Sequence, residues 1–166
     1  MKQYLRKIDQ NTVGNRYDVS PLFSDFESFN TLIDDLLKDI SGTTIDLVAG
    51  IDALGFVLGT AIALKLGVGL LVVRKGDKLP CEVNTIDFQD YTAQAKQLEI
   101  RKDILAKGMR VLIVDDWIET GSQVSSVITL IEGQGAIVAG IAAINMDSNE
   151  LTNSLRSEYD AYTVME

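Results

Sequence analysis

Two adjacent carboxylates followed by hydroxyl-bearing residues form the segment of this chain whose residue types and spacing point most directly to chemistry. Asp115 and Asp116 come directly after the strand-like run Arg110–Val114, and residues 120–123 read Thr-Gly-Ser-Gln. Hydroxyls, a glycine and the N–H groups of a starting helix suit a phosphate. Carboxylates accept hydrogen bonds from sugar hydroxyls and can hold Mg²⁺ through water. A ligand with a diol at one end and a phosphate at the other, such as ribose 5-phosphate, satisfies both halves.

An ordinary connection between a strand and a helix, with capping Asp and Thr side chains, explains the same spacing equally well. The elements that position this segment therefore matter, and the rest of the sequence predicts an α/β domain covering residues 1–166. The expected helices cover residues 26–40, 53–66, 125–132 and 151–157. The expected strands cover residues 45–50, 69–73, 110–114 and 136–144, with an edge strand at 161–164. Apolar strands that alternate with helices are typical of a parallel sheet, in which ligands bind beyond the carboxyl ends of the strands.

Two segments do not follow this alternation of strands and helices. Residues 1–20 predict an irregular N-terminal segment. Residues 75–100 contain Pro80, many polar side chains and only weak alternation of apolar residues. They predict a long, mobile excursion that projects from the domain, with a hairpin as one form that it can take.

The composition of the chain excludes several classes of function. The net charge of −9 repels a nucleic-acid backbone and an anionic membrane, so we expect neither as a partner. The chain has no histidine, which removes Ser-His and Cys-His nucleophilic pairs and histidine-bound zinc. Cys81 is the single cysteine, and the first residues lack the apolar run of a secretory signal, so we expect a cytoplasmic protein.

The pattern that ends in the two acids resembles the signature of type I phosphoribosyltransferases. It reads Val-Leu-Ile-Val-Asp-Asp, three further residues and Thr-Gly over positions 111–121. Other segments resemble adenine phosphoribosyltransferases in particular, in the same order and with similar spacing. These segments are Asp-Val-Ser-Pro-Leu at 18–22, the pyrophosphate-loop region at 46–56, and the start and end of the mobile catalytic loop at 73–80 and 97–100. The resemblance runs from about Tyr17 to the C-terminus.

This resemblance implies a fold and a reaction. The fold is the type I phosphoribosyltransferase fold, a central, mostly parallel sheet flanked by helices with a protruding flexible loop, usually in a homodimer. The reaction is a step of purine salvage that transfers the 5-phosphoribosyl group of phosphoribosyl pyrophosphate to adenine, with Mg²⁺, and gives AMP and pyrophosphate. No direct metal ligand is implied, because Mg²⁺ binds through substrate and water, with Asp115 and Asp116 as the residues that could contribute.

The resemblance also assigns roles to individual residues of this chain. The implied catalytic residues are Asp115, Asp116 and Asp90, the last as a proton carrier for which a plain solvated acid is the alternative. The implied substrate-binding residues are Asp115, Asp116, Glu119, Thr120, Gly121, Ser122 and Gln123 for the ribose phosphate, Arg74, Lys75 and Lys78 for pyrophosphate, and Tyr17 beside the base.

Several residues in these segments depart from the family pattern, among them Ser122 and Gln123, which stand for the usual Gly and Thr. Leu54 stands where the family usually has an arginine that binds pyrophosphate, and Tyr17 stands where adenine enzymes often have an arginine beside the base. Glu119 replaces a small residue, and its carboxylate would repel a nearby phosphate. These departures leave two alternatives open: a non-catalytic relative that binds phosphoribosyl pyrophosphate or a nucleotide in a regulatory role, and an enzyme that accepts a different base.

Overall fold

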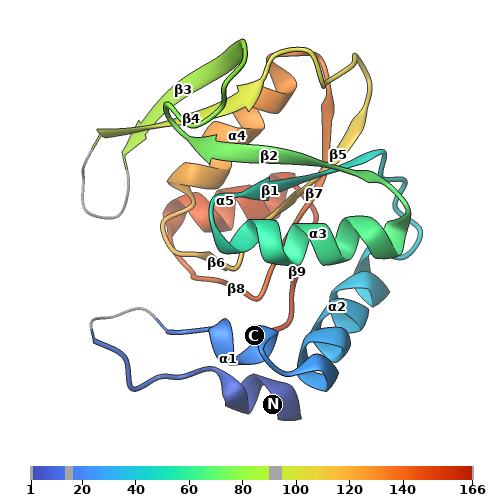
Figure 1. The fold of residues 1–166 in the computed structure, drawn as a ribbon, viewed down its shortest axis with the longest axis vertical. Coiled ribbons are helices and arrows are strands. Elements are labelled where there is room, and N and C mark those ends of the chain that lie inside the picture. The colour runs from blue at the N-terminus through green and yellow to red at the C-terminus, as the bar shows by residue number, and fades with distance from the viewer. Residues whose placement is uncertain (1, 14–16, 90–94, 166) are drawn as a thin grey trace.

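The central feature of the fold is a seven-stranded sheet (Figure 1). The structure is a computed structural model that describes residues 2–13, 17–89 and 95–165. The strands of this sheet are β1 (Leu47–Ile51), β2 (Gly69–Lys75), β3 (Val83–Gln89), β4 (Ala95–Arg101), β5 (Arg110–Val114), β7 (Ile137–Ala143) and β9 (Ala161–Thr163). Their order is β3-β4-β2-β1-β5-β7-β9, in which the pairs from β2 to β9 are parallel and the pairs made by β4 are antiparallel. The predicted α/β class with a mostly parallel sheet is confirmed.

Helices cover both faces of this sheet. The helical segments are η1 (Gln3–Lys7), α1 (Ser20–Phe23), α2 (Phe26–Ile40), α3 (Leu54–Leu66), α4 (Ser122–Glu132) and α5 (Glu150–Glu158). Side chains of alternate residues in β5 point to opposite faces of the sheet. Val111 and Ile113 pack with α4 and α5, whereas Leu112 and Val114 pack with α2 and α3. Within the described part of the chain, no helix combines the length and the apolar content needed to cross a bilayer.

Most of the predicted elements are present with small changes in their bounds. Strand β5 covers the predicted residues, and α2 begins after Asp25, whose carboxylate accepts a hydrogen bond from the Ser28 N–H at 2.9 Å. Helix α4 begins at Ser122, earlier than the predicted start at residue 125. The short strands β6 (Trp117–Ile118) and β8 (Asn145–Met146), which form a second, two-stranded sheet, were not predicted because two residues are too few to show a period.

The segment 75–100 contains the β3–β4 hairpin, which extends beyond the helices in Figure 1. Its base belongs to the main sheet, since Arg74 and Lys75 of β2 pair with Glu99 and Leu98 of β4. Leu98 is fully buried, as is Ile100. The hairpin form is therefore present, and its β4 strand is part of the hydrophobic core.

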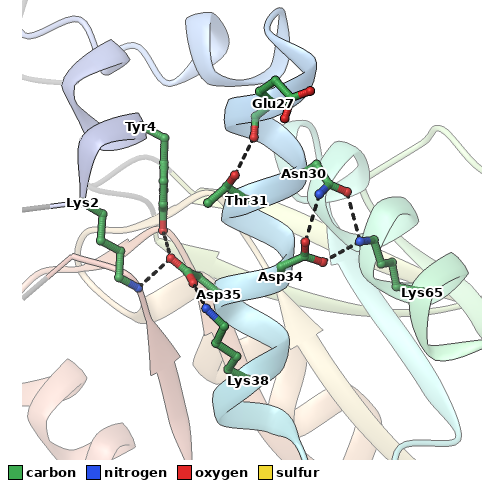
Figure 2. Close-up of polar contacts among 9 residues, drawn as sticks. All are labelled: Lys2, Tyr4, Glu27, Asn30, Thr31, Asp34, Asp35, Lys38 and Lys65. Carbon is green, nitrogen blue, oxygen red and sulfur yellow. Dashed lines mark hydrogen bonds and ion pairs between the residues drawn. The ribbon is translucent and has the colours of Figure 1, made fainter.

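The N-terminal segment, predicted to be irregular, contains the short 3-10 helix η1 and an isolated bridge between Asp9 and Asp18. Polar contacts hold η1 on α2, as Figure 2 shows: Asp35 accepts a hydrogen bond from the Tyr4 hydroxyl at 3.0 Å and pairs with Lys2 at 3.2 Å. Burial and the neighbouring Asp35 carboxylate raise the pKa of Tyr4. The opposite side of α2 is tied to α3 through Lys65, which donates to Asn30 at 3.0 Å.

Candidate active site

The two adjacent acids lie at the carboxyl end of β5, where backbone bonds fix them against the end of β7. The Asp115 N–H donates to the Ala142 carbonyl at 3.1 Å, and the Asp116 carbonyl accepts from the Ile144 N–H at 3.0 Å. Asp115 is 7% exposed, and its side chain accepts a hydrogen bond from the Asp116 N–H at 2.9 Å. The direction of this turn is therefore set by main-chain geometry, before any ligand binds.

Close packing of α3 against this turn depends on glycine. A Cβ atom added to Gly55 would lie 2.6 Å from the Val114 carbonyl oxygen and 3.3 Å from Oδ1 of Asp115. A Cβ atom on Gly50 of β1 would lie 2.7 Å from the Gly55 carbonyl oxygen. Glycine at position 55 therefore allows the start of α3 to lie directly against the end of β5.

The phosphate-binding candidates form the start of α4. Gly121 has a φ of +83°, a left-handed conformation that glycine adopts without strain, and α4 begins at the next residue. The Thr120 hydroxyl accepts a hydrogen bond from the Ser122 N–H at 3.3 Å and donates to the Ser122 hydroxyl at 3.2 Å. The first N–H groups of a helix have no acceptor within it and favour an anion, so this end of α4 suits a phosphate.

A second support for the loop was not found by the sequence analysis. Asn149 caps α5 in a capping box with Thr152, and its side-chain amide donates to the Glu119 carbonyl at 2.7 Å. The Trp117 indole N–H donates to Asp147 at 3.1 Å, and β6 pairs with β8 in parallel. The Asn-x-x-Thr pattern at 149–152 indicates a helix start, but nothing in the sequence indicates which loop that start contacts.

These segments line one cleft of about 1320 Å³. The cleft contains eight of the predicted site residues: Tyr17, Lys75, Asp115, Asp116, Glu119, Thr120, Gly121 and Gln123. Arg74, Lys78 and Ser122 are not among the described residues that line it. Asp90, the predicted proton carrier, lies outside the described residues.

The charge of the cleft is mainly negative. Its described lining holds the carboxylates of Asp18, Asp52, Asp115, Asp116, Glu119 and Asp147. Two lysines, Lys75 and Lys96, are the cations of the same described lining. A polyphosphate cannot approach so many carboxylates favourably without a cation beside it, and carboxylates are ligands that suit Mg²⁺.

The segments that the sequence assigned to pyrophosphate meet at the ends of β1 and β2. Arg74 pairs with Asp52 through Nε at 2.9 Å, and its guanidinium lies 5.9 Å from the centre of the Phe56 ring. Asp52 and Leu54 both line the cleft. The sequence analysis did not predict the pairing of Arg74 with Asp52, which joins two separate segments of the chain.

An aromatic pair forms another part of the cleft wall. The rings of Tyr17 and Trp117 meet edge to face, with centroids 5.3 Å apart and an interplanar angle of 84°. Both line the cleft, and Tyr17 is 42% exposed. Trp117 also packs against the core on the α2–α3 side of the sheet, in agreement with a role in anchoring the loop.

Comparison with known proteins assigns this arrangement to a family. Residues 25–165 match the family described as phosphoribosyl transferase domain. An adenine phosphoribosyltransferase of Thermoanaerobacter sp. is 37% identical over 99% of this chain and 94% of its own length. One of Corynebacterium jeikeium is 38% identical over 76% of this chain and spans a longer protein, of which 62% is covered. The crystal structure of adenine phosphoribosyltransferase from Thermoanaerobacter pseudethanolicus superposes with a TM-score of 0.86, at 32% identity, over 98% of this chain and 96% of that one. The chain therefore belongs to the phosphoribosyltransferase family.

Proposed function

We propose that this protein transfers the 5-phosphoribosyl group of phosphoribosyl pyrophosphate to adenine, giving AMP and pyrophosphate in purine salvage. The observation that carries the proposal is the shared cleft: the paired acids after β5 and the glycine start of α4 line the same cavity. The names of the full-length relatives support adenine as the base.

The proposed reaction forms a bond between N9 of adenine and C1′ of the ribose and breaks the bond between C1′ and the pyrophosphate oxygen. The proton on N9 is released, and the electron pair of the broken bond leaves with pyrophosphate. Asp115 and Asp116 bind the ribose hydroxyls, and the segment from Thr120 to Gln123 binds the 5′-phosphate. These contacts hold C1′ in place while positive charge develops on the ribose ring, and the nearby carboxylates stabilise that charge.

At the other end of the substrate, we propose that Lys75 faces the leaving pyrophosphate, because it lines the cleft. Arg74 precedes Lys75 in β2 and is paired with Asp52. Lys78 lies in the turn that follows β2. Asp90 stays our predicted proton carrier. The ring of Tyr17 lies beside the base, and Trp117 supports it through the edge-to-face contact.

The donor set of the cleft fits Mg²⁺. Carboxylate oxygens are hard ligands, and no three acidic side chains of the described residues converge in a way that would hold a metal by themselves. We therefore propose that Mg²⁺ would bind mainly through substrate and water, with Asp115 and Asp116 as the residues that would help to hold it. When bound, the ion neutralises charge on the leaving pyrophosphate.

The test is to incubate the purified protein with phosphoribosyl pyrophosphate, Mg²⁺ and one base at a time: adenine, hypoxanthine, guanine or xanthine. We expect AMP with adenine and little product with the 6-oxopurines. Product with xanthine or guanine alone would reject adenine as the base. Tight binding of phosphoribosyl pyrophosphate by calorimetry, without product from any base, would reject catalysis and support a regulatory relative.

We also propose that the protein acts as a homodimer in the cytoplasm. Phe26 on α2 and Leu64 on α3 are each 77% exposed, and burial of these apolar side chains against a second chain would be favourable. Light scattering over a range of protein concentrations tests the dimer, and a monomeric mass at every concentration rejects it. Fractionation of cells that produce the protein tests the location, which recovery outside the cytoplasmic fraction rejects.

A further inference from the structure

Glu99 of β4 is a buried carboxylate to which the proposed reaction gives no role. Among the described residues, the buried charged side chains are Asp115, at the ribose end of the cleft, and Glu99, which is 3% exposed. Burial of a carboxylate is unfavourable unless hydrogen bonds or opposite charges compensate for the lost water. The partners of Glu99 therefore indicate what it stabilises.

Those partners are three consecutive backbone N–H groups. Oε2 of Glu99 accepts from Asp77 at 3.0 Å, and Oε1 accepts from Lys78 at 2.8 Å and from Leu79 at 2.6 Å. Successive N–H groups that converge in this way form a nest for an anion, here supplied by the protein itself. Asp77 has a φ of +61°, which is rare for a residue with a side chain and shows how strongly the turn is held.

The electrostatics around Glu99 agree with an ionised carboxylate. Burial by itself raises the pKa of Glu99, but the hydrogen bonds from Lys78, Leu79 and Asp77, together with the charge of Arg74, lower it below its ordinary value overall. Arg74 lies directly opposite Glu99 in the β2–β4 register and also pairs with Asp52. The charge of Arg74 thus acts both on Glu99 and on Asp52, which lines the cleft.

The turn that Glu99 holds directly follows Lys75, the lysine that lines the cleft at the end of β2. It also contains Lys78. The Gly76 N–H donates to the Gln97 carbonyl at 2.9 Å, so the turn is fixed to β4 on both sides of Asp77. We infer that Glu99 is a positioning residue, whose carboxylate orders the turn from Gly76 to Leu79 and so holds Lys75, which directly precedes this turn, in place to face the leaving pyrophosphate. This inference rests on the proposed function.

The experiment compares the wild type with Glu99→Gln, Glu99→Asp and a control, Asp87→Asn. The glutamine side chain of the first variant has a similar shape, but its NH₂ group would face at least one N–H group of the turn. Glu99→Asp keeps the charge and shortens the reach by one methylene group. Asp87 lies exposed on β3 of the same hairpin and accepts a hydrogen bond from Gln97 at 3.0 Å, so the control also changes a hydrogen-bonded carboxylate to an amide.

Steady-state kinetics give the first measurement. For Glu99→Gln we expect kcat/KM for phosphoribosyl pyrophosphate to fall about tenfold or more, since one hydrogen bond to a charged group has about that value. The KM for adenine should change less than about twofold, because the turn does not contact the base. Glu99→Asp should restore part of the loss, and Asp87→Asn should match the wild type. Equal effects on both substrates would overturn the inference.

Amide hydrogen exchange of residues 77–79 gives a measurement that does not depend on activity. Exchange at these amides should be slow in the wild type and about tenfold faster or more in Glu99→Gln, with other amides of the hairpin unchanged. Equal protection in the two proteins would overturn the inference. If the wild type forms no nucleotide with any base, the proposed function fails by itself. Calorimetry with Mg²⁺ and pyrophosphate then decides the role of Glu99, since equal affinity of the wild type and Glu99→Gln would reject it.

Discussion

The two ends of the cleft are held in place by different kinds of contact. At the end that we propose binds the ribose phosphate, main-chain hydrogen bonds join Asp115 and Asp116 to the end of β7, and a glycine starts α4. At the end that we propose binds pyrophosphate, the turn at 77–79 is held by the side chain of Glu99, which lies 22 positions after Asp77 in the chain. A site built on main-chain geometry tolerates many side-chain changes, whereas a site held by one carboxylate depends on that residue.

The largest effect is expected where the main chain beside Asp115 and Asp116 is disturbed. Gly55→Ala should destabilise the protein by about 3 kcal/mol, because a severe clash in a packed interior has roughly this effect. Here the added Cβ would lie 2.6 Å from the Val114 carbonyl oxygen, which cannot move without displacing β5. Urea unfolding gives the change in free energy.

Gly69→Ala is the matched control for this substitution. Its added Cβ would meet the flexible end of Leu47 at 3.2 Å, so the free energy of unfolding should change by less than about 1 kcal/mol. Similar losses in the two variants would contradict the idea that close contact between α3 and β5 holds the acidic turn.

Removing one charge at the same end should affect activity more than stability. Asp116→Asn should lower kcat/KM about a hundredfold, which corresponds to about 2.7 kcal/mol. The amide can accept hydrogen bonds from ribose, but it cannot stabilise the positive charge that develops on the ring. The assay with adenine measures this effect, and Asp87→Asn on the exposed hairpin serves as the control. A loss shared by the control would refute a local role for Asp116.

The local structure from β5 to the start of α4, which we propose binds the ribose phosphate, could be predicted from the sequence for physical reasons. An apolar strand, two acids, a glycine and a helix start are consecutive, so their types and spacing describe the site locally. The pyrophosphate end could not be predicted in the same way. The contact between Arg74 and Asp52 and the bonds from Glu99 to the turn join residues that are distant in the chain, and no local period reports such pairings. The burial of strand β4 was not predicted, because its alternation of apolar and polar residues is weak. The strand is buried by its contacts with α4 and β2.

A positive charge can be added at Leu54, where the segment that we propose binds pyrophosphate departs from the family pattern. Leu54→Arg should lower the KM for phosphoribosyl pyrophosphate by about tenfold, because a charged hydrogen bond to the leaving group has roughly that value. Leu54 lines the cleft and is the first residue of α3, where an added side chain can reach solvent or substrate. Leu54→Met, with similar length and no charge, should leave the KM unchanged. A KM that stays the same in the arginine variant would show that this wall does not face pyrophosphate.

The smallest expected effect is on the free energy of unfolding in acid, and it distinguishes Glu99 from the other acidic residues. Its pKa is raised by burial but lowered overall in the folded state by the turn's N–H groups and by Arg74, so ionised Glu99 stabilises the fold. This contribution is complete above the unfolded pKa of about 4.5 and is lost as the pH falls through the lower folded value. Asp25 and Asp103 also have lowered pKa values, so the wild type alone loses stability in acid for several reasons.

The difference in unfolding free energy between the wild type and Glu99→Gln cancels these shared effects. This difference should be constant from about pH 7 to about pH 5.5 and shrink below about pH 4.5. Urea unfolding of both proteins at a series of pH values measures it. A difference that stays constant into acid would mean that the turn does not depend on the charge of Glu99, and the two ends of the cleft would then be held in the same way.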